Sequence, residues 1–255
     1  MRFIDLSVAI EHKLPSDPPQ TQQEIIYQDH AFGADLMTKL IPGVRVSDLP
    51  GEKGWAVEDL KLNSHSGTHV DAPWHYAPVM NGTEKARTID QMPLEYCFSD
   101  GVVVDFRDKG DGYLVTPKDF EKAFAKMGYA LKPLDIVLVL TGAMSLWGKP
   151  AYLGKGCGMG RDSTLWLLDR GVKVTGTDAW SWDRPLPVMA KEFSEKGDKS
   201  VIWEAHYAGR DKEFYHMEKM ANLDQLPPFG FKVACFPVKI KDAGAGWTRA
   251  VAILD

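Results

Sequence analysis

The pattern of apolar and polar residues predicts a chain in which strands alternate with helices. Continuous apolar runs are typical of strands buried on both faces, and apolar residues that alternate with polar ones indicate strands with one exposed face. On this basis strands are predicted at 3–10, 55–63, 102–106, 136–140 and 173–176. A terminal hairpin is predicted from 231–240 and 248–254, which flank a glycine-rich turn between Asp242 and Gly246.

Capping signals predict where two helices begin. Thr116 is a favourable N-cap and Pro117 fits the first helical turn, so a helix should run from there to about Met127, just before a glycine. A second helical pattern covers 162–169, with an apolar stripe and a glycine two residues after its end. Weaker helical patterns cover 189–196 and 200–208.

These elements predict an α/β fold with a mixed, partly barrel-like sheet flanked by helices. No segment is long and polar enough to serve as a linker, so residues 1–255 are expected to form a single domain. The segment of about 11–54 is predicted to be an irregular arm, with Asp29 and His30 in a solvated loop. The arm carries five prolines, at positions 15, 18, 19, 42 and 50.

Composition and charge exclude several classes of protein. The 255 residues include 30 Lys and Arg against 35 Asp and Glu, and this acidic balance argues against a nucleic-acid partner. There is no apolar run of the length that a membrane span requires, and the first residues do not form a secretory signal. Three widely spaced cysteines fit a reducing compartment, so we expect a cytoplasmic protein.

Three of the seven histidines lie within the 11 residues from His65 to His75. A helix is disfavoured there by Gly67 and by a proline two residues before His75. In an extended chain, side chains at every second position share one face, which would bring His65, His69, Asp71 and His75 together. Imidazoles and a carboxylate suit a divalent cation, Zn²⁺ or alternatively Mn²⁺. The cluster therefore predicts an open, catalytic type of metal site.

Other residues leave more than one interpretation open. His206 and Glu218 stand twelve positions apart without a local motif, and His216 competes with them as a ligand. Trp180 and Trp182 would share a face of an extended segment, either in the core or lining a pocket. The glycine run 154–160 lacks the spacing of a nucleotide-binding fingerprint, and Cys157 has no neighbouring histidine to activate it as a nucleophile.

The segment from His65 to His75 has the form H-x-G-T-H-x-D-x-P-x-H, which resembles the signature of the cyclase family of metal-dependent hydrolases. The family includes bacterial kynurenine formamidase and isatin hydrolase. The resemblance implies that His65, His69 and Asp71 are metal ligands and that His75 is a proton shuttle. In the formamidase branch a later His and Glu at the spacing of His206 and Glu218 complete a two-metal site.

Further features support the same resemblance. Residues 176–183 look like the family's G-x-D-x-x-S-x-D motif, and the similarity spans most of the chain. It implies the family's swivelling β/β/α fold and a homodimer or higher homo-oligomer. The substrate would be a small amide, formamide, cyclic amide or lactone. Candidate residues of its pocket are Trp74, Trp180, Ser181 and Trp182.

The family pattern is not complete. The tryptophan that the formamidase branch carries after its first strand is missing from 14–19, the arm before Trp55 is longer, and 147–160 resembles an insertion. An arylformamidase-like reaction is therefore weighed against a mononuclear, manganese-dependent cyclic amidase or lactonase like isatin hydrolase. More distant alternatives are a non-haem Fe(II) oxygenase, which would leave His65 without a role, and a metal-binding protein without catalysis.

Overall fold

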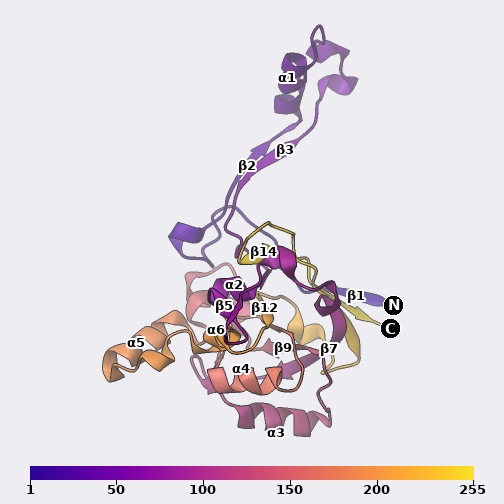
Figure 1. The fold of residues 1–255 in the computed structure, drawn as a ribbon. Helices are drawn as coiled ribbons and strands as arrows, with labels where there is room; N and C mark the ends of the chain where they lie inside the picture. Colours follow the sequence, from indigo (N-terminus) through magenta and orange to yellow (C-terminus); the bar gives the residue numbers. More distant parts are fainter.

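The computed structural model describes residues 1–255 and is built around one nine-stranded sheet (Figure 1). The strands follow one another across the sheet in the order β1 (Arg2–Asp5), β15 (Val251–Leu254), β13 (Phe231–Ala234), β7 (Phe98–Asp105), β9 (Ile136–Leu140), β11 (Val174–Thr177), β12 (Tyr215–Glu218), β4 (His69–Asp71) and β14 (Ala245–Trp247). Strands β7, β9, β11 and β12 are parallel, and the other neighbours pair antiparallel.

The other elements are short pairs of strands and six helices. The pairs are β2 (Glu24–Gln28) with β3 (Val57–Lys61), β5 (Val79–Met80) with β6 (Glu84–Lys85), and β8 (Leu114–Val115) with β10 (Gly158–Met159). The helices are α1 (His30–Leu40), α2 (Pro73–Tyr76), α3 (Pro117–Met127), α4 (Arg161–Leu168), α5 (Leu186–Lys196) and α6 (Glu204–Tyr207). None of them combines the length and the apolar character needed to cross a membrane.

The sheet curls until its two ends meet. Strands β14 and β15 lie near opposite ends of the strand order, yet only three residues, 248–250, separate them in sequence. Within this link the Thr248 amide donates to the Thr68 carbonyl beside β4, and the Ala250 carbonyl accepts from the Leu6 amide just after β1. The predicted α/β class with a mixed, partly barrel-like sheet is confirmed.

Two apolar layers hold the sheet, one on each face. Along β9, Ile136, Leu138 and Leu140 point into the curl, where they join a core of 21 buried residues. The alternate residues Val137 and Val139 face the opposite side, where helices α3 and α4 cover the sheet (Figure 1). Because both faces are covered, β9 is a continuous apolar run in the sequence.

The capping residues in the local sequence correctly predicted where α3 begins and ends. The Asp119 carboxylate accepts from the backbone amide and the hydroxyl of Thr116, at 2.9 and 2.7 Å, which closes the first turn. The helix ends at Gly128, which has φ +65°, a left-handed conformation that glycine adopts without strain. Helix α4 lies within one residue of its predicted range.

The glycine run and the cysteine inside it have structural roles. A Cβ at Gly158 would lie 2.1 Å from the Arg184 backbone nitrogen, so this glycine lets two backbone segments approach closely. Cys157 is buried, and burial raises the pKa of its thiol to about 12. A thiol with such a pKa is a poor nucleophile at neutral pH.

The prediction for the C-terminal segment was only partly right. Strands β13 and β15 do pair antiparallel, but the expected turn between them contains β14, which pairs with β4 at the far end of the sheet. Helix 200–208 is also broken, because Trp203 has φ +54° and leaves only the short α6 after it. The pairing of β14 with β4 joins residues that are distant in sequence, which local patterning does not report.

The N-terminal arm is regular over residues 24–40, where an irregular segment was predicted, whereas 11–23 and 41–54 contain only short 3-10 turns. Strands β2 and β3 form an antiparallel ribbon that projects from the body and carries α1 at its far end (Figure 1). Asp29 is the single residue between β2 and α1, and its carboxylate caps the helix by accepting from the amides of Ala31 and Phe32, each at 3.0 Å. His30 is the first residue of α1, and both side chains are exposed, as predicted. The prolines after α1 lie in its connection to β3 and interrupt neither element. Strand 55–63 exists as β3, but within the arm.

Candidate metal centre

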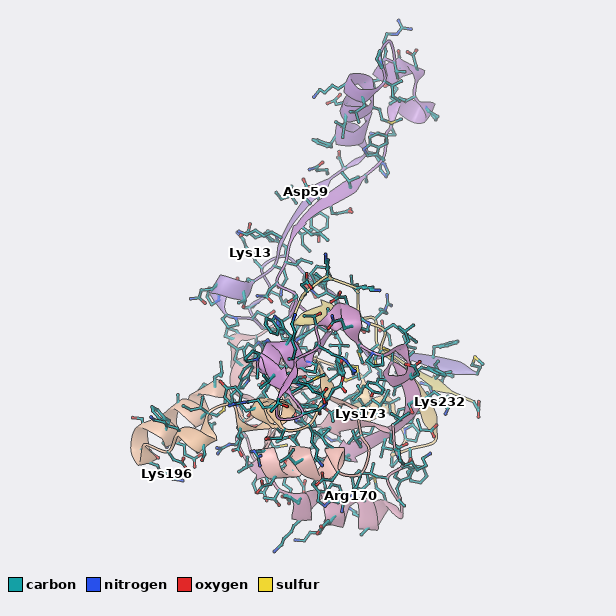
Figure 2. The ribbon with its side chains drawn as sticks, viewed as in Figure 1. Lys13, Asp59, Arg170, Lys173, Lys196 and Lys232 are labelled. Atoms are coloured by element: carbon teal, nitrogen blue, oxygen red, sulfur yellow. The ribbon has the colours of Figure 1, made fainter.

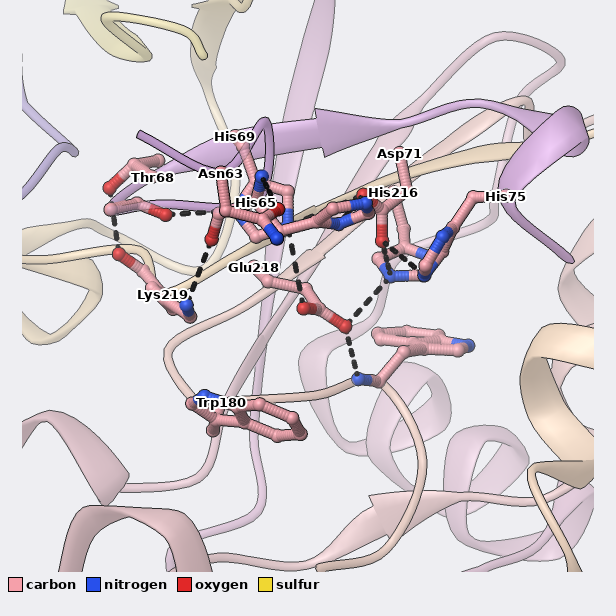
Figure 3. Close-up of polar contacts among 12 residues, drawn as sticks. Asn63, His65, Thr68, His69, Asp71, His75, Trp180, His216, Glu218 and Lys219 are labelled. Atoms are coloured by element: carbon pink, nitrogen blue, oxygen red, sulfur yellow. Dashed lines mark hydrogen bonds and ion pairs between the residues drawn. The ribbon is translucent and has the colours of Figure 1, made fainter. Parts of the chain in front are cut away.

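Two antiparallel strands place four polar side chains on one face of the sheet. Strand β4 pairs with β12 so that Asp71 lies opposite His216 and His69 opposite Glu218. Side chains of directly paired residues point to the same face, so two imidazoles and two carboxylates converge here (Figure 3). All four side chains are buried, in spite of their polarity.

The Asp71 carboxylate is the centre of the cluster. Its oxygens lie 2.8 Å from His65 Nδ1, 3.3 Å from His69 Nε2 and 3.2 Å from His216 Nε2. His206 Nε2 and His75 Nε2 follow at 3.8 and 3.9 Å. Five of the seven histidines of the chain therefore face this single carboxylate.

Glu218 forms the second acidic point of the cluster. Its carboxylate lies 3.0 Å from His216 Nε2, 3.6 Å from His206 Nε2 and 3.5 Å from His69 Nε2. Two sets of side chains in the cluster have the spacing of metal ligands; Asp71 belongs to both of them and His69 to neither. The sets are Asp71, His206, His216 and Glu218, and His65, Asp71 and His75.

Three of the imidazoles are oriented by a bond at their other nitrogen. His69 Nδ1 lies 2.8 Å from the Gly67 carbonyl, and His206 Nδ1 contacts the Asp183 carboxylate. His216 Nδ1 lies 3.2 Å from the hydroxyl of Tyr76. Such contacts fix a ring so that its Nε2 lone pair faces a metal. The cluster therefore has outer contacts typical of a metal centre.

The two carboxylates are ionised and hold protons on the neighbouring imidazoles. Burial would raise the pKa of Asp71, but His65, His75 and His69 lower it well below its usual range. Burial would likewise lower the pKa of His69, but the Asp71 and Glu218 carboxylates raise it to about 9, and the pKa of His216 is also raised to about 9. The site therefore attracts positive charge strongly.

The residues present fit a divalent cation. The oxygens of the buried Asp71 carboxylate make no hydrogen bond of good geometry, although the ring nitrogens of five histidines lie between 2.8 and 3.9 Å from them. A buried carboxylate is costly unless positive charge lies beside it, and a cation held by carboxylate oxygens and neutral imidazole nitrogens would supply that charge. The donor set of N and O atoms suits a divalent transition metal.

A cavity of about 290 Å³ opens onto the cluster. Its lining includes His65, His75, His206 and Glu218, together with Trp180 and Ser181 from the predicted pocket. Trp74 and Trp182 do not line it. Trp74 is 41% exposed on α2, and Trp182 is buried in the core, where its indole donates to Thr164 Oγ1. The Trp182 backbone amide does contact the site, by donating to Glu218 Oε1 at 3.1 Å.

His75 stands at the wall of this cavity, at the end of the short helix α2. Its side chain is 28% exposed, whereas His69 and His216 are fully buried. Burial lowers the pKa of His75 to about 4 against the opposing effect of Asp71, so the ring is neutral at pH 7. A neutral imidazole beside both the cluster and the cavity is placed to accept a proton.

Sequence reasoning left out or undervalued several residues of the site. His216 was treated as a competitor of His206, but the two face the same carboxylates. Its position two residues before Glu218 on a strand was the signal that both share a face. Trp203, which stacks on His206 with ring centroids 4.2 Å apart, and the buried Lys219–Asp17 ion pair had no such signal.

Comparisons with known proteins agree with the geometry. The family described as "Putative cyclase" matches residues 4–184. Kynurenine formamidase of Erythrobacter litoralis is 26% identical over 230 residues, which cover 85% of this chain and 91% of that protein. Kynurenine formamidase of Salinibacter ruber is 26% identical over 200 residues, covering 75% and 77%.

Solved structures share the fold. An isatin hydrolase bound to the product analogue thioisatinate superposes with a TM-score of 0.77 at 19% identity, covering 99% of this chain and 92% of that one. Isatin hydrolase A of Labrenzia aggregata, bound to benzyl benzoate, has a TM-score of 0.74 at 21% identity, covering 99% and 93%.

Proposed function

The chain belongs to the cyclase family of metal-dependent hydrolases, and on that premise we propose that it hydrolyses a small formamide or amide in an arylformamidase-like reaction. The observation that carries the proposal is the Asp71 carboxylate, which is fully buried at the point where five imidazoles converge. Membership of a hydrolase family also favours this reaction over that of a non-haem oxygenase.

We propose His65, His69, Asp71, His206 and Glu218 as the metal ligands. Asp71 belongs to both sets of side chains with ligand spacing, so its carboxylate would be able to contribute to either one or two ions. The nitrogen and oxygen donors favour Zn²⁺, with Mn²⁺ as the alternative. When bound, such a cation lowers the pKa of water and stabilises negative charge that develops on a carbonyl oxygen.

The chain's own residues would supply positioning and proton transfer. The neutral His75 accepts a proton from the attacking water and returns it to the leaving nitrogen. Asp183 holds the His206 ring by accepting from its Nδ1 and from the backbone amides of residues 205 and 206. The Trp182 amide fixes one oxygen of Glu218, so this carboxylate keeps its orientation.

The cavity supports a small, planar substrate. Its volume of about 290 Å³ lies at the lower limit of ordinary ligand sites, which suits a molecule with one or two rings. Trp180, Ser181 and Trp203 are among the residues that line it. The sequence relatives named kynurenine formamidase favour an N-formyl aromatic amine as the substrate class.

One experiment tests the proposed function. The purified protein is analysed for bound metals and is then assayed with N-formyl aromatic amines, isatin-like cyclic amides and small lactones, before and after removal of metal with a chelator. We expect hydrolysis of the formamides that disappears with the metal and returns when Zn²⁺ or Mn²⁺ is added. Activity that resists complete removal of the metal would contradict the proposal, and hydrolysis of the cyclic amides alone would favour the isatin-hydrolase-like reaction.

Three further properties belong to the same proposal. The whole chain, residues 1–255, would act as one hydrolase unit, in association with further copies of itself. The protein would work in the cytoplasm, which is consistent with its three buried and unpaired cysteines. Its partners would be small molecules and not nucleic acids.

A further inference from the structure

A buried ion pair lies at the wall of the cavity beside the metal centre. The Lys219 ammonium contacts the Asp17 carboxylate, and both residues line the cavity although they are only 3% and 4% exposed. Asp17 belongs to the segment before β2, and Figure 2 shows Lys13 of this segment where the arm joins the body. Lys219 directly follows Glu218 at the end of β12. The pair therefore joins an N-terminal segment to the metal centre.

The backbone of Lys219 turns its side chain towards the cavity. Neighbouring residues of a strand point to opposite faces, yet Glu218 and Lys219 both line the cavity. Lys219 has φ +58°, in the left-handed region that is unfavourable for residues other than glycine. Its amide donates to the Ala179 carbonyl at 3.0 Å, and its carbonyl accepts from Thr68 Oγ1 at 2.7 Å. Backbone strain that the surroundings maintain in this way is typical of functional positions.

The Asp17 carboxylate is satisfied by donors within the protein. Its Oδ1 accepts from Lys219 Nζ and, at 3.0 Å, from the Trp180 indole. Its Oδ2 accepts from Gln23 Nε2 at 2.7 Å. The carboxylate is therefore fixed next to the ammonium, and the two charges balance each other.

The Lys219 ammonium, in contrast, keeps one N–H group without an acceptor. An ammonium has three donors. Two of them have acceptors, which are Asp17 Oδ1 and the His65 carbonyl, the latter at 2.9 Å. The ammonium lies between the histidine cluster and the Trp180 ring, whose centre is 5.7 Å away (Figure 3). A buried donor without an acceptor costs free energy, so the third N–H group favours an acceptor that enters from the cavity.

The ammonium is close to the metal centre. His65 links the two, because its ring nitrogen lies 2.8 Å from the Asp71 carboxylate and its carbonyl lies 2.9 Å from Lys219 Nζ. Both points belong to one cavity of about 290 Å³. A molecule with a single ring can therefore contact the cluster and the ammonium at the same time.

We propose that Lys219 is a specificity-determining residue, which donates its third N–H group to an uncharged oxygen of the substrate beside the amide that is hydrolysed. The inference rests on the proposed function, because the reacting amide must lie at the metal centre. Asp17 already balances the charge of Lys219. An uncharged oxygen therefore satisfies the donor, whereas a carboxylate would lie beside Asp17 without a positive charge of its own.

Calorimetry with three ring amines tests the proposal without requiring hydrolysis. The probes are ortho-aminoacetophenone, ortho-isopropenylaniline, in which a CH₂ group replaces the ketone oxygen, and ortho-aminobenzoate. Each is titrated into the full-length protein loaded with Zn²⁺. We expect the ketone to bind about tenfold or more tightly than its isopropenyl analogue, as is usual for a hydrogen bond to a charged donor. The ketone should also bind more tightly than the carboxylate.

A double variant assigns this preference to Lys219. Asp17→Asn/Lys219→Met removes both charges together, so that neither ion is left buried without its partner. It should bind the ketone and the isopropenyl analogue equally. Arg87→Met/Glu213→Gln is the matched control, because it removes an ion pair of 2.6 Å outside the cavity and should keep the preference. The same comparison is then made as the ratio of kcat/KM values for the N-formyl derivatives, in which the intrinsic reactivity of each substrate cancels between enzymes.

The outcomes separate this proposal from the proposed reaction. A wild type that does not distinguish the ketone from its analogue, or a preference that persists in the double variant, overturns the role of Lys219 and leaves the ion pair a structural one. Tighter binding of the carboxylate overturns the choice of an uncharged oxygen. A binding preference without hydrolysis overturns the reaction but not the role of Lys219. If the double variant does not fold, the comparison of the three probes in the wild type still decides, because it needs no substitution.

Discussion

Metal binding should release about two protons or more at neutral pH. His69 and His216 point Nε2 at the carboxylates of Asp71 and Glu218, which raise the pKa of each imidazole to about 9 despite burial. At pH 7 both rings are therefore protonated in the metal-free protein. A ring that coordinates a cation must lose its Nε2 proton, because the cation binds the lone pair of that nitrogen. A ring that does not coordinate also loses its proton more easily, because the positive charge of the cation lowers its pKa. Asp71 and Glu218 release none, because their pKa values are already well below neutrality.

The sign and size of the pH effect follow from these values. A raised histidine pKa means that protons compete with the metal at low pH, so the apparent affinity rises as the pH increases. Between pH 6.5 and 7.5, two imidazoles with pKa values of about 9 predict a gain of about 100-fold in affinity, whereas two ordinary imidazoles predict about threefold.

Calorimetry measures both quantities. Mn²⁺ is titrated into the metal-free protein at several pH values, in pairs of buffers with different ionisation enthalpies, and the difference between buffers gives the protons released. His216→Gln should lower the release by about one proton, and the matched variant His30→Gln, at an exposed position in the arm, should not change it. Release of less than half a proton per protein at pH 7, or an affinity that changes only threefold, would refute this account of the cluster.

Three further changes test other parts of the structure. His75→Ala should retain the metal but lower kcat by roughly 100-fold or more, as expected for loss of a general base; loss of metal in the same variant would make His75 a ligand. Asp119→Asn should lower the free energy of unfolding by about 2 kcal/mol at pH 7, because Lys109 and the other donors hold the pKa of Asp119 at about 2 despite burial. This stabilisation is present above pH 4 and is lost as the pH falls towards 2. Denaturant titrations that give the same difference between wild type and variant at pH 2 as at pH 7 would contradict it. Asp17→Ala should destabilise the protein by roughly 3 kcal/mol, since it leaves the Lys219 ammonium buried without its partner, and Asp17→Ala/Lys219→Met should recover much of the loss in thermal unfolding.

The parts of the fold that the sequence predicted well depend on neighbours in the chain. The Thr116–Asp119 box, the terminal glycine of α3 and the apolar run of β9 are each complete within a few residues. The arm was missed because its order depends on pairing between β2 and β3, whose paired residues Gln28 and Val57 are separated by a long connection. The prolines in that connection were interpreted as evidence of an irregular segment, although they lie outside both strands and α1.

In the metal centre too, residues close in sequence were predicted and residues brought in by long-range pairing were not. The even spacing of His65, His69, Asp71 and His75 correctly anticipated that they would meet, although only 69–71 is a strand and His75 reaches the cluster from a helical turn. Glu218 and His216 join them because β12 is inserted between β11 and β4, a pairing that no local pattern encodes. Once that pairing exists, alternation along β12 makes His216 face the cluster whenever Glu218 does. The histidine that was treated as a rival ligand is therefore an unavoidable member of the site, and it alters the charge balance of the cluster whether or not it binds metal.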